Sequence, residues 1–180
     1  MTDAVDTVEA ARAARADVER AREFVALWNA RFAETHRTVA EIGGLEPLYL
    51  PPTATSLGRI VCNRDYAASV LHELAHWCVA SPRRRRLVDY GYAYIAPPRD
   101  AAGQQRFFAS EERNQAIESL FAAAAEFPFR VSCDDFTVAS DATVAFAARV
   151  AARAKRYQRD GLPRDAEIFR AALARTRGNG

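Results

Sequence analysis

The sequence predicts a helix-rich α+β fold: a single domain that carries a small sheet. Several segments repeat apolar residues at the three- and four-residue spacing of a buried helix face. Short apolar runs beside glycine and proline indicate strands. The chain has 180 residues, of which 49% are hydrophobic, so it is long enough to bury one sizeable core.

The N-terminal part is expected to hold one long helix and two short strands. Residues 4–34 read as the helix, but only its second half carries large apolar side chains. We therefore expect residues 1–20 to be a helical extension that is loosely attached or frayed, and residues 21–180 to form the main domain. The strand candidates are residues 48–50, which a proline pair follows, and residues 58–62.

A second helix is predicted over residues 66–80, where the apolar residues keep a helical period. Pro82 ends it, because the residue before a proline is pushed out of the α region. Residues 87–95 are predicted to be a third strand, since Tyr90, Tyr92 and Tyr94 alternate with other residues.

The remaining chain is predicted to be mainly helical. Residues 97–105 read as a polar loop, and Ser110 is a candidate cap for a helix over residues 111–125. Residues 127–133 form a short extended stretch. Two further helices cover residues 142–160 and 163–175, separated by Gly161 and started by Pro163.

Charge and cysteine content exclude several classes of protein. A net charge of +2 does not indicate direct nucleic-acid binding, and no apolar run approaches the roughly 20 residues of a membrane helix. The N-terminus lacks the apolar stretch of a secretory signal. The three cysteines are far apart and suggest neither a disulfide framework nor a zinc ribbon. We expect a cytoplasmic monomer.

The second predicted helix carries a candidate metal site, His72-Glu73-Leu-Ala-His76. Residues four apart lie on one helix face, so both imidazoles can bind one metal ion. Glu73 projects about 100 degrees from His72, near enough to act on metal-bound water. Two core histidines on an ordinary helix are the alternative, but the glutamate at this position favours the metal.

A complete site needs a further ligand, and the best candidates are the carboxylates that open the next predicted helix, Glu111 and Glu112. His36 is a weaker candidate because it stands near the end of the first helix. Two histidines and one carboxylate fit two chemistries: a zinc hydrolase with Glu73 as general base, or a non-haem iron centre open to oxygen. Local spacing does not separate them.

Longer motifs surround this site. HELAHWCVA at residues 72–80 leads to RRLVDYGY at residues 85–92, with EPLYLP at 46–51 and PFRVSCDD at 128–135. Together with Glu111 and the Gly-Leu-Pro turn at 161–163, they resemble the elongation factor P hydroxylase family over residues 24–173. Asn114 and Ser119 stand where that family's pattern has proline and an aromatic residue, which puts substrate contacts in doubt.

The resemblance implies a bacterial protein-lysine hydroxylase that acts on a β-lysyl-modified lysine of elongation factor P, with a fold like that of His-Glu-x-x-His metalloproteases. It implies non-haem Fe(II) held by His72, His76 and Glu111. It also gives Glu73 a role in orientation or proton handling. The alternative is a zinc metallopeptidase that uses Glu73 as general base. A binding module with a structural metal is disfavoured, because structural zinc sites are usually closed by four protein ligands.

Substrate contacts are sought near the metal helix. Four consecutive arginines, residues 83–86, read either as a solvated turn or as a docking patch for an acidic partner. Asp89 could orient a histidine, and the tyrosines that follow could be packing residues. The candidate substrate-binding residues are Arg85, Arg86, Asp89, Tyr92 and Gln115.

Overall fold

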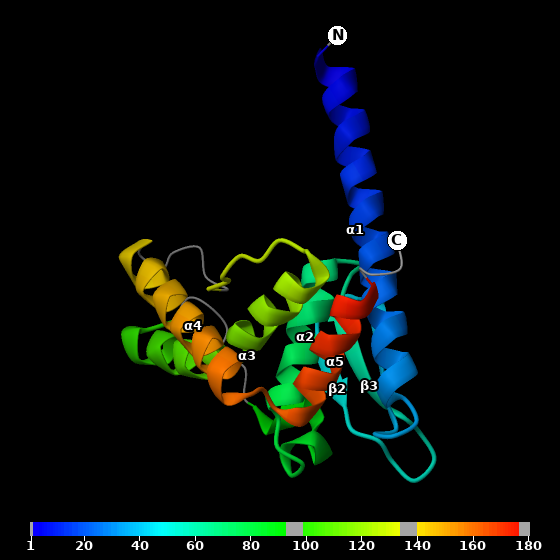
Figure 1. The fold of residues 1–180 in the computed structure, drawn as a ribbon, viewed down its shortest axis with the longest axis vertical. Helices are drawn as coiled ribbons and strands as arrows, with labels where there is room; N and C mark the ends of the chain where they lie inside the picture. Colours follow the sequence, from blue (N-terminus) through cyan, green and yellow to red (C-terminus); the bar gives the residue numbers. More distant parts are fainter. Residues whose placement is uncertain (1, 93–98, 134–139, 177–180) are drawn as a thin grey trace. The chain divides into compact units, whose positions relative to one another are not determined.

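The computed structural model describes residues 2–92, 99–133 and 140–176 (Figure 1). Its regular elements are α1 Thr2–Phe32, β1 Thr38–Gly44, β2 Leu48–Leu50, β3 Gly58–Asn63, α2 Ala67–Val79, α3 Ala101–Ala125, α4 Ser140–Asp160 and α5 Arg164–Arg175. Two short 3-10 helices, Arg84–Arg86 and Val88–Gly91, follow α2. The chain divides into two compact units, residues 1–74 with 86–89 and residues 75–85 with 90–180, so the division falls inside the continuous helix α2.

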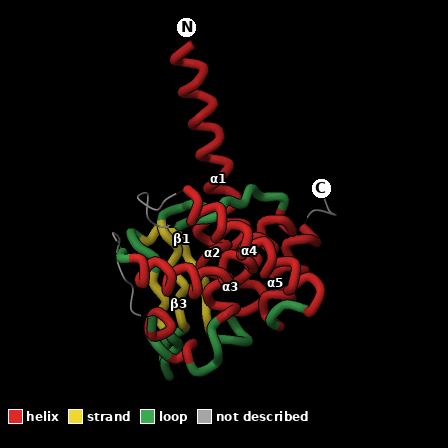
Figure 2. Tube along the Cα trace, turned by 90° about the vertical axis from the view of Figure 1, so that its left-hand side faces the viewer, coloured by secondary structure: helices red, strands yellow, loops and turns green. Residues whose placement is uncertain are grey.

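The first unit is built on a three-stranded sheet with the order β1-β3-β2, drawn in yellow in Figure 2. Strand β1 runs parallel to β3, and β2 runs antiparallel to it. Helix α1 packs beside β1, where Asn29 donates to the carbonyl of Ala40 at 3.0 Å and accepts from its N–H at 2.7 Å. One side chain thus supplies both hydrogen bonds that an edge strand would otherwise seek from another strand.

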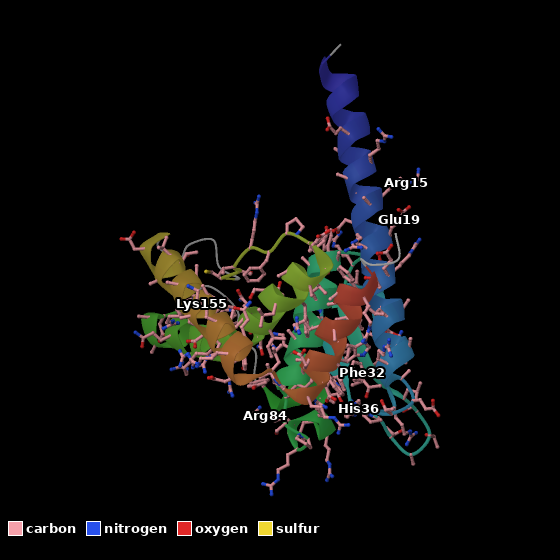
Figure 3. The ribbon with its side chains drawn as sticks, in the orientation of Figure 1. Arg15, Glu19, Phe32, His36, Arg84 and Lys155 are labelled. Atoms are coloured by element: carbon pink, nitrogen blue, oxygen red, sulfur yellow. The ribbon has the colours of Figure 1, made fainter. Side chains whose placement is uncertain are left out.

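The second half of α1 supplies much of the core of this unit. Phe24, Trp28 and Phe32 recur at four-residue intervals and are almost completely buried. Arg15 and Glu19, which precede these residues on the helix, are exposed (Figure 3). The expected contrast between the two halves of the helix is confirmed, and the helix itself starts at Thr2. The proposed division of the chain at residue 20 stays a prediction.

The second unit is a layer of helices in which α3 packs against both α4 and α5. Phe108 of α3 stacks on Phe146 of α4 with ring centroids 4.4 Å apart, and Phe121 meets Phe169 of α5 edge-on at 5.1 Å. Such aromatic pairs add to the free energy of burying the rings. Because α3 packs against two helices, its orientation is fixed, and so are the positions of the polar residues on its remaining surface.

The structure confirms the predicted fold class: a helix-rich protein with a small sheet. The strand candidates at 48–50 and 58–62 are confirmed, as are the helices at 66–80, 142–160 and 163–175, each within a few residues of its predicted ends. Strand β1 was not predicted, because the glycine pair at its end interrupts the apolar pattern of a strand. Among the described residues, no helix combines the length and apolarity needed to cross a membrane.

Two predictions were wrong. Residues 101–105 are not loop: α3 begins at Ala101, where the Asp100 carboxylate caps the helix by accepting from the N–H of Gly103 at 2.6 Å. Residues 87–92 are not strand but a 3-10 turn, in which Asp89 and Tyr90 adopt left-handed backbone angles. The alternating tyrosines were therefore not a reliable sign of a strand in this segment. Tyr94 lies outside the described residues.

Candidate metal centre

Helix α2 presents the motif because its other positions are needed for packing. Val70, Leu71 and Leu74 are buried, as are four of the residues that follow them, whereas His72, Glu73 and His76 are only partly buried. The first turn is capped from α1, since Asp17 accepts a hydrogen bond from the N–H of Ala67 at 3.2 Å. Packing thus fixes the rotation of the helix and so the direction of the two imidazoles.

His76 is held by side chains from α3. Its Nε2 lies 3.4 Å from Oε1 of Glu111, and its Nδ1 lies 2.8 Å from the amide nitrogen of Asn114. The ring is also parallel to that of Tyr90, with an interplanar angle of 9° and centroids 6.4 Å apart. Glu111 and Asn114 therefore lie beside the ring nitrogens of His76, and the Tyr90 ring runs parallel to the imidazole.

Glu111 is buried, with 6% of its surface exposed. Asn114 donates to its Oε1 and Gln115 to its Oε2, each at 3.3 Å. Gln115 is itself clamped to Ser132, donating to its carbonyl at 2.8 Å and accepting from its N–H at 3.0 Å. A buried carboxylate is costly unless it is hydrogen-bonded or bound to a cation, and these two amides meet part of that need.

His72, His76 and Glu111 form a group that could hold a metal ion, with one ligand atom from each and all three atoms within 4.8 Å of one another. Metal bonds to imidazole nitrogen and carboxylate oxygen are about 2.0–2.2 Å long, so two ligands of one ion lie about 3.0–3.5 Å apart. The 3.4 Å between His76 and Glu111 already matches that spacing. The donor set therefore fits a transition metal.

The cysteines do not compete for this role. Burial raises the pKa of the Cys78 thiol well above its ordinary value. The positive charge of Arg85 lowers the same pKa, but by less. Burial also raises the pKa of Cys62, and the nearby carboxylates of Glu73 and Glu41 raise it further. Both side chains are buried and lie outside the group of residues that could hold a metal ion. Cys78 is a core residue.

Glu73 directly follows His72 on α2 and lies outside the group formed by His72, His76 and Glu111. Its carboxylate lies close enough to Cys62 of β3 to influence the thiol. The carboxylate is half-buried, so it can exchange protons with water. Its catalytic role stays a prediction.

The predicted substrate contacts separate into two kinds. Arg85 is engaged inside its own unit, with its guanidinium 3.4 Å from the centre of the Trp77 ring and 2.8 Å from Asp165. Gln115 is buried against Ser132, as described above, and Asp89 accepts from the N–H of Tyr49 at 2.9 Å. Arg86 and Tyr92 lie on the surface, and Tyr92 is 45% exposed. A substrate role for all five stays a prediction.

Sequence reasoning missed two neighbours of the metal group. Asn114 contacts both His76 and Glu111, although the sequence indicates only that it departs from a family pattern. Its place three residues after Glu111, on the same helix face, was the available signal. Tyr90 lies beside His76, and the alternation that predicts a strand gives no sign of this ring pair.

Comparison with known proteins supports one family. A model of the family described as elongation factor P hydroxylase matches residues 27–179. The chain is also 37% identical over 152 residues to a protein of Haemophilus influenzae named elongation factor P lysine hydroxylase, covering 84% of this chain and 85% of that protein. The matched region contains the metal group and the residues that support it. The chain therefore belongs to the elongation factor P hydroxylase family.

Proposed function

We propose that this protein hydroxylates a lysine of elongation factor P, the activity stated in the name of its Haemophilus influenzae relative. The observation that carries the proposal is the group of His72, His76 and Glu111 inside a family match that spans most of the chain. The substrate is the β-lysyl-modified lysine, and because it belongs to a translation factor, the proposed reaction takes place in the cytoplasm.

The metal of the proposed site is non-haem Fe(II). Two imidazoles and one carboxylate leave coordination positions open, the donor set typical of iron oxygenases. Bound iron would supply the oxygen-activating redox chemistry that no side chain of this chain provides. In the overall reaction one oxygen atom enters a C–H bond of the lysine and the other leaves as water, so an external reductant must deliver two electrons.

The chain's own side chains prepare the ligands. Asn114 links two of the proposed ligands. Its amide nitrogen lies 2.8 Å from Nδ1 of His76 and donates to Oε1 of Glu111, so one side chain fixes both residues. Gln115 keeps one carboxylate oxygen of Glu111 fixed through its own attachment to Ser132.

Glu73 is proposed to handle protons at the edge of the site. It is half-buried and adjoins His72 on α2, so it can exchange protons with water while it remains outside the ligand group. In this role Glu73→Gln slows hydroxylation but leaves the metal bound. The variant also separates the hydroxylase from a zinc peptidase, in which the same change would abolish peptide cleavage.

The direct test is the intact mass of elongation factor P after co-expression with this protein. The wild-type chain should add the mass of one oxygen atom, and His72→Ala should add none. His36→Ala is the matched control: His36 is the chain's other histidine, at the end of α1 beside Phe32 (Figure 3), and its loss should leave the oxygen gain intact. Unchanged substrate mass with the wild-type protein, under conditions where the β-lysyl group is present, would refute the proposal.

Metal content gives a second, independent check. Protein purified without chelator should contain iron at close to one atom per chain, and His72→Ala and Glu111→Ala should each lose it. Stoichiometric zinc together with peptide cleavage would instead favour the metallopeptidase.

A further inference from the structure

The turn that follows the metal helix has an unusual backbone. Asp89, Tyr90 and Gly91 have φ angles of 47°, 57° and 67°, three left-handed residues in succession. L-residues avoid this region because the β-carbon approaches the carbonyl oxygen, and only glycine adopts it freely. The other left-handed non-glycine residues that the structure describes, Arg37, Arg64 and Glu126, each occur singly.

Specific contacts hold this turn in place. The guanidinium of Arg84 donates to the carbonyl of Tyr90 at 2.9 Å and lies 4.2 Å from the centre of the Tyr92 ring. The Asp89 carboxylate accepts from the N–H of Tyr49 in β2. Strained backbone persists only where the surroundings impose it, and such places cluster at functional sites.

The strained turn places one side chain against the candidate metal ligand. The Tyr90 ring is 5% exposed and parallel to the His76 imidazole. The ring nitrogens of His76 face Asn114 and Glu111, and the turn adds the parallel tyrosine ring beside the imidazole, with the two centroids 6.4 Å apart. Rotation of the imidazole about its Cβ–Cγ bond would tilt it out of this parallel arrangement.

We propose that the Asp89-Tyr90-Gly91 turn positions His76 for metal binding, with the Tyr90 ring fixing the plane of the imidazole. The inference rests on the proposed metal site, and Tyr90 acts through His76 rather than on the substrate. A residue that orients a metal ligand typically changes metal affinity by about 10- to 100-fold when it is removed.

The first test removes the aromatic face. Tyr90→Phe keeps the ring and should bind Co²⁺, used as a spectroscopic probe, within about twofold of the wild-type affinity. Tyr90→Leu keeps an apolar side chain but loses the ring, and should weaken Co²⁺ binding about 10-fold or more and alter the visible absorption spectrum of the bound ion. Circular dichroism shows whether each variant is folded.

The second test leaves the tyrosine in place and disturbs only the turn. Gly91→Ala puts a β-carbon on a left-handed residue, and Gly161→Ala is the matched control because Gly161 has a φ of 93°, has open space around its α-carbon and joins α4 to α5. Both variants should lower the thermal midpoint, since both strain the backbone. Only Gly91→Ala should also weaken Co²⁺ binding and shift its spectrum.

The outcomes separate this inference from the proposed function. Wild-type Co²⁺ affinity and spectrum in both Tyr90→Leu and Gly91→Ala would overturn the positioning role while leaving the metal site intact. Equal losses of affinity in Gly91→Ala and Gly161→Ala would overturn it too, because general destabilisation would then explain the effect. A wild-type chain that binds no Co²⁺ would refute the metal site, and the positioning role with it.

Discussion

Replacing Gln115 by leucine should destabilise the metal-free protein by about 2–3 kcal/mol. The side chain makes two hydrogen bonds with the backbone of Ser132 and one with the buried carboxylate of Glu111. A neutral bond contributes about 1 kcal/mol, and a bond to a charged group about 1.5–3 kcal/mol. The bond to Glu111 is long, at 3.3 Å, and belongs at the low end of its range. Water can replace part of the bonding at the exposed Ser132, so the total of about 3.5 kcal/mol is reduced.

The assay is urea unfolding followed by circular dichroism, with chelator present so that metal does not add to the stability. For a chain of this size, the predicted loss should lower the thermal midpoint by about 4–12 °C. Gln105→Leu is the matched control: the side chain is an exposed glutamine on the same helix, and its replacement should change stability by less than about 0.5 kcal/mol.

A double-mutant cycle isolates the part that concerns the metal ligand. In a Glu111→Leu background the same glutamine has no carboxylate to bind, so Gln115→Leu should cost about 1.5 kcal/mol less than in the wild-type background. A loss below about 1 kcal/mol in the wild-type background, or an equal loss in both, would show that Gln115 does not support Glu111.

Other consequences concern the packing and the buried thiols. Phe146→Ala removes a fully buried ring and should cost about 3–5 kcal/mol in urea unfolding. Arg85→Ala loses a stacked indole and a largely buried ion pair, and should cost about 2–3 kcal/mol; an effect below 0.5 kcal/mol would mean that these contacts do not form in solution. Because burial raises the pKa of Cys62 and Cys78 above the ordinary 9.0, the folded state keeps protons that the unfolded state releases, so stability should be complete below pH 9 and fall as pH rises beyond it. In the native protein a thiol reagent should modify the partly exposed Cys133 first, and rapid loss of all three thiols would contradict the burial.

The sequence alone determined those features that local chain geometry controls. Helix α2 and its motif were predictable because residues four apart share a helix face whatever the helix packs against. The end of the helix was predictable because Pro82 excludes the α conformation for the residue before it. The third ligand was not determined in this way. Glu111 and Glu112 are equivalent in local pattern, and the resemblance to a known family selected the first.

Tertiary structure decided which of these two carboxylates faces the histidine. The Phe108 and Phe121 contacts orient α3, so that Glu111 lies beside His76 while Glu112 pairs with Arg153 of α4. The start of α3 at Ala101 was not predicted, because the polar composition of residues 97–105 suggested a loop. The Asp100 cap and the burial of Gly103 and Gln104 make these residues the beginning of a helix.

The turn at residues 88–91 was the element that the sequence predicted least well. Alternating tyrosines satisfy the period of a strand, but hydrogen bonds of Arg84 and Asp89 to residues outside the turn hold it in left-handed angles that the alternation does not indicate. Local sequence thus determined the two histidines and the helix that carries them. Long-range packing decided the buried carboxylate, its amide partners and the aromatic ring against His76, because burial depends on contacts between residues far apart in the chain.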